Sequence, residues 1–253
     1  MATFVYRIYQ FFIAMPIALL STILTTLFTI IGSTVASAHI WGYYPGKYWS
    51  KIMCRVLLLP VEIRGRENVD KNTSYVFVAN HQSAFDIFLI YGYIGRNFKW
   101  MMKKALRKMP LVGQACESGR HIFVDKSGPK KVRETYDKAR EILKEGTSLV
   151  VFPEGARTYT GHMGVFRRGA FQLADELQLP VVPMTIDGAF DVLPRTAGFN
   201  FVKWHKLTMT IHKPIFPKGK GPENVRETMD EAYEAIMSAL PERHKGFVEN
   251  KDQ

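Results

Sequence analysis

The chain has 253 residues, enough to bury a sizeable core in one domain of ordinary size or in a domain with an appendage. Its formal net charge of +11 is compatible with nucleic acid, an anionic membrane surface or phosphorylated substrates, and charge alone does not choose among them. The two cysteines, Cys54 and Cys116, lie far apart without a CxxC motif, which argues against a zinc site or a disulfide framework and favours reducing surroundings.

The first predicted element is an apolar segment that carries no formal charge between Arg7 and Lys47. As a single helix it would be roughly 58 Å long at about 1.5 Å per residue, whereas the hydrocarbon core of a bilayer is about 30 Å thick. The segment must therefore tilt, break or turn back. The expected interruptions are Pro16 and the Gly32–Thr34 stretch.

Aromatic and basic residues end this segment. Amphipathic rings favour the headgroup level of a bilayer, and bases just beyond them can meet anionic lipid. The rings are Trp41, Tyr43, Tyr44, Tyr48 and Trp49, and the bases are Lys47, Lys51 and Arg55. We therefore expect residues 1–58 to anchor the protein to the membrane.

The topology of this anchor follows from its flanks. Because bases lie on both sides, the positive-inside rule favours a re-entrant helical hairpin at the cytoplasmic face over a single crossing. Two alternatives stay open: a cleaved signal peptide that ends near the "ASA" of residues 36–38, and an ordinary buried helix pair.

Residues 59–253 form the second predicted unit, whose pattern is that of an α/β domain. β-Branched and aromatic runs bounded by turn residues predict strands at Val61–Arg64, Ser74–Ala79, Lys99–Met102, His121–Asp125, Ser148–Phe152, Val181–Ile186 and Leu207–Ile211. Helical patterns lie between several of them, notably at Lys130–Lys144, Phe166–Gln178 and Glu223–Ala239. This alternation predicts an α/β fold with a mixed, mostly parallel sheet flanked by helices.

The stretch "VFVANHQSAFD" places an ionisable ring where a predicted core strand ends. Ligands of open α/β sheets bind beyond the carboxyl ends of strands, which is where His81 lies. Asp86 falls in the first turn of the next helix, which Ser83 can cap. It could therefore either complement that helix N-terminus or accept the Nδ1–H of His81 and leave Nε2 as a general base.

Three further strand ends extend the pattern. "GRHIFVDK" spans residues 119–126, "FPEGART" spans residues 152–158, and "VVPM" surrounds Pro183. Together with the N-H-x4-D spacing of Asn80, His81 and Asp86, these segments resemble, in order, the four motifs of the glycerolipid acyltransferase superfamily. The resemblance is strongest to the 1-acylglycerol-3-phosphate (lysophosphatidic acid) acyltransferases.

This resemblance implies that His81 is the general base and that Asp86 orients it. It also implies that substrate is bound by Glu154, Gly155, Arg157, Lys126 and Asn80. An arginine fork suits phosphate, although a surface ion pair between Arg157 and Glu154 is the alternative. Two residues depart from the family pattern: Lys126 stands where arginine is usual and lacks the fork, and Ala156 stands where threonine is usual and lacks a hydroxyl.

The implied activity is acyl transfer from an acyl-CoA or acyl carrier protein thioester to the sn-2 hydroxyl of 1-acylglycerol 3-phosphate, giving phosphatidic acid. We expect no metal and no cofactor besides the thioester co-substrate, and no nucleic-acid partner. An acyltransferase for another lyso-lipid or for glycerol 3-phosphate is the first alternative, and a non-catalytic, basic, membrane-associated lipid-binding protein is the second.

Two basic features are left open. Six lysines or arginines and no acid lie between Arg96 and Lys108, and Arg167 and Arg168 adjoin Gly169. Both features could be solvated helix faces, could lie on anionic lipid, or could meet the phosphates of the acyl donor.

Overall fold

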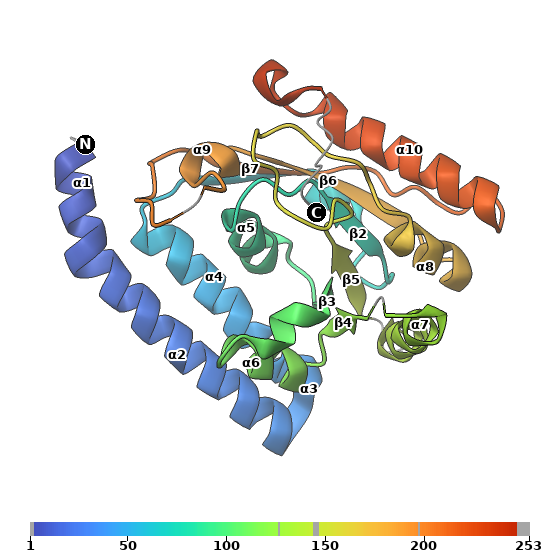
Figure 1. Ribbon diagram of the computed structural model, residues 1–253, viewed down its shortest axis with the longest axis horizontal. Coiled ribbons are helices and arrows are strands. Elements are labelled where there is room, and N and C mark those ends of the chain that lie inside the picture. Colours follow the sequence, from blue (N-terminus) through green and yellow to red (C-terminus); the bar gives the residue numbers. More distant parts are fainter. Residues whose placement is uncertain (1–2, 126, 144–146, 197, 247–253) are drawn as a thin grey trace.

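The computed structural model describes residues 3–125, 127–143, 147–196 and 198–246. Within them, one sheet of seven strands lies between two layers of helices (Figure 1). The strands are β1 (Val61–Arg64), β2 (Val76–Ala79), β3 (Phe98–Lys103), β4 (Ile122–Val124), β5 (Ser148–Val151), β6 (Val181–Asp187) and β7 (Leu207–Ile211). Their order across the sheet is β1-β7-β6-β2-β5-β3-β4, and every neighbouring pair is parallel except β6 and β7. The predicted mixed, mostly parallel sheet is confirmed.

The helices of the α/β part divide between the two faces of this sheet. They are α4 (Tyr44–Val56), α5 (Phe85–Tyr93), α6 (Val112–Ser118), α7 (Pro129–Leu143), α8 (Gly169–Leu177), α9 (Ala189–Val192) and α10 (Pro222–Ser238). Side chains of β2 alternate between the layers: Phe77 and Ala79 pack in a core with α4 and α5, and Val76 and Val78 pack in a core with α7, α8 and α10. β2 is therefore buried on both faces, and the loop that follows it starts from a rigid position.

The predicted helices differ from the observed ones at their ends. α7 ends at Leu143 and α10 begins at Pro222, each within one residue of the prediction, and residues 144–146 lie outside the described part of the chain. α8 begins at Gly169 rather than Phe166. The backbone N–H of Arg167 instead bonds the Pro153 carbonyl at 2.9 Å, which ties this segment to the loop after β5.

The N-terminal segment is one helical rod from Thr3 to Trp41, long and apolar enough to cross a membrane. It comprises α1 (Thr3–Tyr9), α2 (Met15–Gly32) and α3 (Ala38–Trp41), joined by π-helical segments at Gln10–Ala14 and Ser33–Ser37. Only 11% of its most apolar window is buried, so it is not an ordinary buried helix pair. This composition and exposure suit membrane association.

The predicted interruptions do not break this rod. Just before Pro16, the Met15 N–H bonds the Gln10 carbonyl five residues back, so a π-turn absorbs the missing proline donor. A second π-turn follows Gly32. The regular α-helix is thus interrupted beside both predicted places, although neither reverses the chain. The chain reverses at Gly42 and Tyr43, and α4 returns along the rod, so the hairpin-like arrangement is present.

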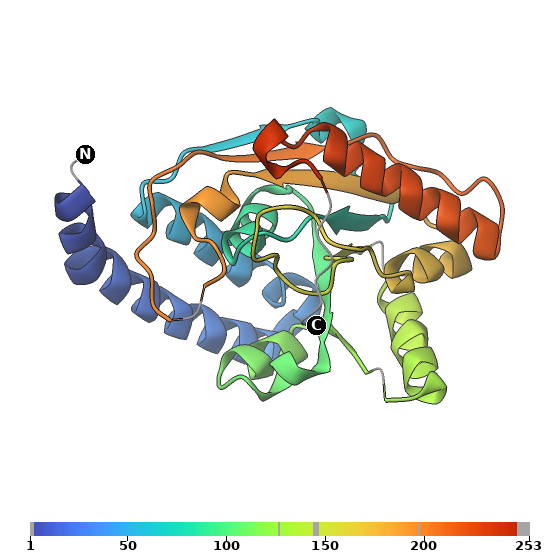
Figure 2. The ribbon, with the colours of Figure 1, turned by 45° about the horizontal axis from the view of Figure 1, so that its top comes forward.

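Hydrogen bonds join the two arms along their length. Tyr6 Oη donates to the Leu57 carbonyl at 2.6 Å, and Trp49 Nε1 donates to Thr22 Oγ1 at 3.0 Å. The sheet also holds the end of the rod before the turn at Gly42, because the buried Lys99 of β3 donates from Nζ to the Ala38 carbonyl at 3.0 Å. These contacts fix the rod against the α/β part, on the side of the sheet opposite α10 (Figure 2).

The aromatic cluster at the end of the rod is divided. Tyr43 is buried and stacks on Tyr91 with ring centroids 5.7 Å apart, so the expectation that it lies at headgroup level was wrong. Trp41, Tyr44 and Tyr48 remain exposed.

Candidate active site

The site lies at the carboxyl edge of the central strands. β2 pairs in parallel with both β5 and β6, so the segments that follow β2 and β5 leave the same edge of the sheet side by side. This topology brings Asn80 and His81 next to the "FPEGART" segment, in which Glu154 lies 73 residues after His81. The Thr158 N–H donates to the His81 carbonyl at 2.9 Å and joins the two loops directly.

His81 and Asp86 form a pair at the start of α5. The Nδ1 of His81 lies 2.7 Å from Oδ2 of Asp86, whose side chain is fully buried, while the histidine side chain is 13% exposed. A carboxylate at Nδ1 fixes the tautomer in which Nε2 carries no proton, and it stabilises the imidazolium that forms when Nε2 takes one. The predicted His–Asp geometry is present.

Asp86 also serves the helix start. Its Oδ2 accepts the backbone N–H groups of Gln82 at 2.7 Å and Ser83 at 2.8 Å. Helix α5 begins at Phe85 with Ala84 as its cap residue, so Ser83 is not the cap, although its hydroxyl accepts the Phe85 N–H at 3.2 Å. The two interpretations of Asp86 hold together: the same carboxylate closes the turn and orients the ring.

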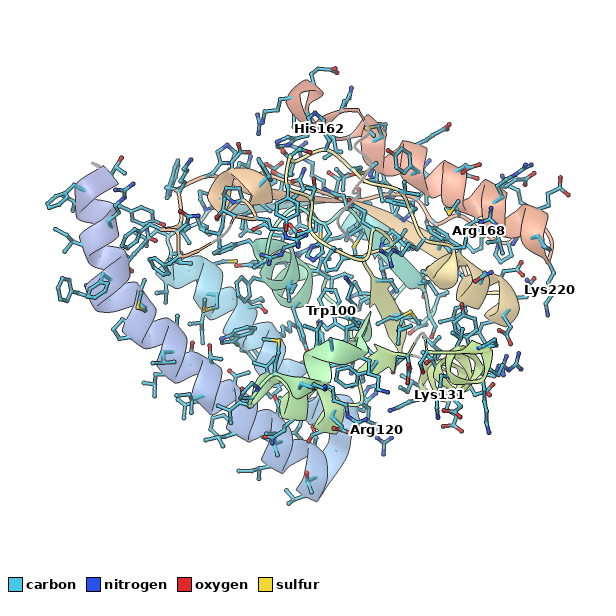
Figure 3. All side chains as sticks on the ribbon, viewed as in Figure 1. Trp100, Arg120, Lys131, His162, Arg168 and Lys220 are labelled. Carbon is cyan, nitrogen blue, oxygen red and sulfur yellow. The ribbon has the colours of Figure 1, made fainter. Side chains whose placement is uncertain are left out.

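Aromatic rings support the histidine. His81 stacks on Phe152 with centroids 3.8 Å apart and planes 7° apart, and Phe152 stacks on Trp100 at 5.4 Å. Trp100 lies near the middle of the view in Figure 3, whereas Arg168 lies toward the right-hand margin. This stack was not predictable from the sequence, because an apolar residue at the end of a strand gives no sign of which ring it contacts.

Glu154 is buried under the segment that carries His81 and bonds its backbone. It is 1% exposed, its Oε1 accepts the His81 N–H at 2.7 Å, and its Oε2 accepts the Gly164 N–H at 2.8 Å. Burial raises the pKa of this carboxyl to about 8, although the two backbone hydrogen bonds oppose the shift. We predicted a substrate contact here, and the structure corrects this prediction: Glu154 positions the backbone of His81.

Asn80 is corrected in the same way. Its side chain is fully buried, its Nδ2 donates to the Ile186 carbonyl at 2.8 Å, and its Oδ1 accepts the Ile186 N–H at 2.8 Å. The amide therefore ties the end of β2 to β6 and does not face a ligand. A side-chain amide suits this position, because its separate NH₂ donor and C=O acceptor match the backbone C=O and N–H of one residue.

Arg157 follows the tight turn at Gly155, whose φ of +78° favours glycine. The alternative ion pair with Glu154 is not formed, because both carboxylate oxygens of Glu154 bond backbone N–H groups inside the protein. Within the described part of the chain, the Arg157 guanidinium has no hydrogen bond or ion pair to another side chain. It is therefore free to bind an anion.

A second arginine, Arg195, lies beside Arg157 although it comes from a distant part of the chain. Arg195, in the connection between β6 and β7, donates from Nη1 to the Arg157 carbonyl at 2.7 Å, and its guanidinium lies 4.0 Å from the centroid of the Tyr159 ring. The same connection reaches the segment between β2 and α5, because Ser83 Oγ donates to the Leu193 carbonyl at 2.7 Å. No motif in the sequence pointed to Arg195.

The second predicted motif lies farther from the histidine. Its strand, β4, is the edge strand and is separated from β5 by β3. Lys126 lies outside the described residues, so its predicted contact with substrate stays a prediction. His121, in the same motif, is buried, and burial next to Lys99 lowers its pKa to about 3, in keeping with a structural role.

The chain resembles known acyltransferases in sequence and fold. A family model described as acyltransferase matches residues 60–187. A chloroplastic 1-acyl-sn-glycerol-3-phosphate acyltransferase of Brassica napus is 30% identical over 69% of this chain and 50% of its own length. The 1-acyl-sn-glycerol-3-phosphate acyltransferase of Saccharomyces cerevisiae is 27% identical over 85% of this chain and 71% of its own. This chain thus spans about half the length of the Brassica relative and more of the yeast one.

A solved structure gives the same result for the fold. The crystal structure of the 1-acyl-sn-glycerophosphate acyltransferase PlsC from Thermotoga maritima superposes with a TM-score of 0.60 and 27% identity. The match covers 87% of this chain and 94% of the other.

Proposed function

The chain belongs to the acyltransferase family, and from this premise we propose that it transfers an acyl group from a thioester to the sn-2 hydroxyl of 1-acylglycerol 3-phosphate. The observation that carries the proposal is the pair of His81 and Asp86, a ring with one nitrogen held by a buried carboxylate and one left for chemistry. The names of the relatives support the choice of acceptor.

The reaction needs no group on the protein to carry the acyl chain. Nε2 of His81 removes the proton of the acceptor hydroxyl, and the oxygen attacks the thioester carbonyl. The tetrahedral intermediate then collapses: its C–S bond breaks, and the proton on Nε2 passes to the departing sulfur. The products are the free thiol and phosphatidic acid. Asp86 stabilises the imidazolium between the two proton transfers, and Glu154 keeps the backbone of His81 in place.

Arg157 supplies the charge that selects a phosphorylated acceptor. Its planar guanidinium can bind two phosphate oxygens at once, and no acidic side chain among the described residues competes for it. Arg195 supports the same function, because its hydrogen bond to the Arg157 carbonyl orients the backbone of this loop. The predicted contribution of Lys126 is a further positive charge and remains part of the proposal.

The acyl donor and the site of action complete the proposal. Either acyl-CoA or acyl carrier protein can provide the thioester, and no cofactor besides it is required. An acceptor with a long acyl chain resides in a bilayer, and the apolar rod Thr3–Trp41 would hold the site at headgroup depth on the cytoplasmic face. The product places the reaction in phospholipid synthesis.

The test compares acceptors and donors on the purified full chain. Thiol release is measured with acyl-CoA or acyl carrier protein as donor, and with 1-acylglycerol 3-phosphate, glycerol 3-phosphate or a lysophospholipid without a terminal phosphate as acceptor. We expect 1-acylglycerol 3-phosphate to be the preferred acceptor. A clear preference for another acceptor would replace this assignment, and thiol release that no acceptor stimulates would favour a lipid-binding protein.

Arg157→Ala refines this test. The variant should raise KM for the phosphorylated acceptor by about 10-fold or more, since a charged hydrogen bond contributes about 1.5–3 kcal/mol, and should leave KM for the acyl donor unchanged. Arg168→Ala is the matched control, because Arg168 is an exposed arginine at a distance from Trp100 (Figure 3). Equal changes in both KM values would indicate a structural role for Arg157.

A further inference from the structure

A run of ten exposed residues extends from the last residue of β3 to the first residue of α6. We name residues 103–112, "KKALRKMPLV", the amphiphilic loop. It contains four bases and no acid, and four large apolar side chains stand out into solvent: Leu106, Met109, Leu111 and Val112 are 41%, 46%, 43% and 37% exposed. Single exposed apolar residues are normal on a surface, but a cluster of this kind marks an interaction site.

The loop is a folded element that holds these side chains outward. Residues Lys104–Lys108 form a 3₁₀-helix, and the Gly113 N–H bonds the Met109 carbonyl at 2.8 Å. A side chain at Gly113 would meet the Arg107 carbonyl at 2.2 Å, so the loop closes tightly on the start of α6. Leu111 has φ of +61°, a strained conformation for a leucine. Leu111 is thus an exposed leucine in a backbone conformation that glycine adopts more easily.

The loop adjoins the apolar rod. Helix α6, which follows the loop directly, packs against α2, and both lie along the lower edge of the molecule in Figure 1. At the far end of α6, Gly119 contacts Gly42 in the turn that ends the rod, and Arg120 marks this edge in Figure 3. The neighbouring half of α2 exposes Phe28 and Ile31. The apolar surface of the rod therefore continues onto the α/β part of the protein.

The charges of the loop indicate what covers it. Two of the bases are paired outside the loop, Lys104 with Asp125 and Arg107 with Glu117, while Lys103 and Lys108 form no ion pair within the described residues. All four are exposed and lie within a few residues of the apolar side chains. Apolar side chains rimmed by lysine and arginine fit the boundary between anionic headgroups and acyl chains. An acidic protein surface would match the bases but would leave the four apolar side chains without partners.

We propose that the amphiphilic loop is a second membrane contact, in which Leu106, Met109, Leu111 and Val112 enter the bilayer surface and the bases meet anionic lipid phosphates. The inference rests on the proposal that the rod Thr3–Trp41 lies in the membrane. One contact lies on the rod and the other on the α/β part. Together they fix the orientation of the sheet relative to the bilayer as well as its distance from the bilayer surface. The loop follows β3, which pairs directly with β5, and β5 leads into the site.

The test measures lipid contact residue by residue on the full chain. Cysteine is introduced by Leu106→Cys or Met109→Cys in the loop, by Leu20→Cys on the exposed side of α2, or by Glu234→Cys on α10. Each variant is labelled with an environment-sensitive fluorophore and reconstituted in vesicles of phosphatidylcholine and phosphatidylglycerol with brominated or ordinary acyl chains. The wild-type chain, with Cys54 buried and Cys116 partly buried, is labelled in parallel to give the background.

Bromine should quench the labels at positions 106, 109 and 20 several-fold more strongly than the label at position 234. Quenching at position 20 without quenching at 106 and 109 would overturn the second contact and leave the anchor intact. The absence of quenching at position 20 as well would overturn the anchor and, with it, this inference.

A functional measurement separates the contact from a folding defect. The double variant Leu106→Ser/Met109→Ser should lose activity several-fold on a long-chain acceptor embedded in vesicles and keep its activity on a short-chain, water-soluble acceptor. Equal losses on both acceptors would assign the two residues a structural role and contradict the proposal.

Discussion

The surroundings of Glu154 predict both the direction and the size of the change in the free energy of unfolding when its carboxylate is replaced. Its two carboxylate oxygens accept the His81 and Gly164 N–H groups in a site that is almost closed to water. In Glu154→Gln the side-chain shape is kept, but the amide NH₂ must face one of these two donors. One buried N–H then loses its acceptor, at a cost of about 1–3 kcal/mol in the free energy of unfolding.

The pH dependence follows from the raised pKa. Because the carboxyl titrates at about 8 in the folded state and at 4.5 in the unfolded state, the folded chain holds a proton that the unfolded chain has lost. The proton bound to Glu154 in the folded state therefore contributes to the free energy of unfolding at low pH. This contribution is lost as the pH rises through the folded pKa of about 8. Between pH 6 and pH 9 the loss amounts to about 3 kcal/mol, or roughly 6–12 °C in Tm for a chain of this size.

The assay is thermal unfolding of the wild type and Glu154→Gln in detergent, followed by tryptophan fluorescence at pH 6 and pH 9. The other titrating groups are common to both proteins, so the difference in Tm isolates Glu154. We expect the wild type to be clearly more stable at pH 6 and this advantage to shrink at pH 9. A difference in Tm that does not change with pH would refute a buried carboxyl with a raised pKa.

The remaining predictions concern the neighbours of His81. Asp86→Asn should lower kcat by about 10²–10⁴-fold, because the neutral amide no longer stabilises the imidazolium. Steady-state kinetics measure this loss, and an unchanged KM for the acyl donor would identify it as catalytic. A loss below about 10-fold would contradict this role of Asp86. Gly155→Ala should lower the free energy of unfolding by about 1–2 kcal/mol, because φ at this position is +78° and alanine adopts that conformation with strain. Thermal unfolding measures this loss. An unchanged Tm would contradict it and would mean that the turn relaxes.

Much of the fold was accessible from the sequence. The strands were predictable because apolar, β-branched runs ended at turn residues. The pairing of His81 with Asp86 was predictable because only a short segment separates the end of β2 from the first turn of α5, which carries Asp86. The reversal of the rod at Gly42 was not predictable. Pro16 looked like a helix breaker, but a local π-turn absorbs its missing donor, whereas the actual turn depends on contacts with the distant Lys99 and Tyr91.

The parts of the site that the sequence did not reveal depend on contacts between distant segments. Glu154 occurs in the same motif as Arg157, for which we propose phosphate binding, and only its burial shows that its own carboxylate bonds backbone N–H groups. Asn80 is similar, since its partner, Ile186, lies 106 residues away. Arg195 comes from a connection without regular periodicity, so nothing in its local sequence placed it beside Arg157.

We propose His81 as the general base of acyl transfer. The direct test is thiol release from acyl-CoA with 1-acylglycerol 3-phosphate, for the wild type, His81→Ala and the control His205→Ala, whose ring lies outside the site and contacts the Lys206 carbonyl. We expect His81→Ala to lose about 10²–10⁴-fold in rate while its Tm and its binding to vesicles match the wild type, and His205→Ala to retain full activity. A His81→Ala protein that keeps more than about a tenth of the wild-type rate would contradict the account.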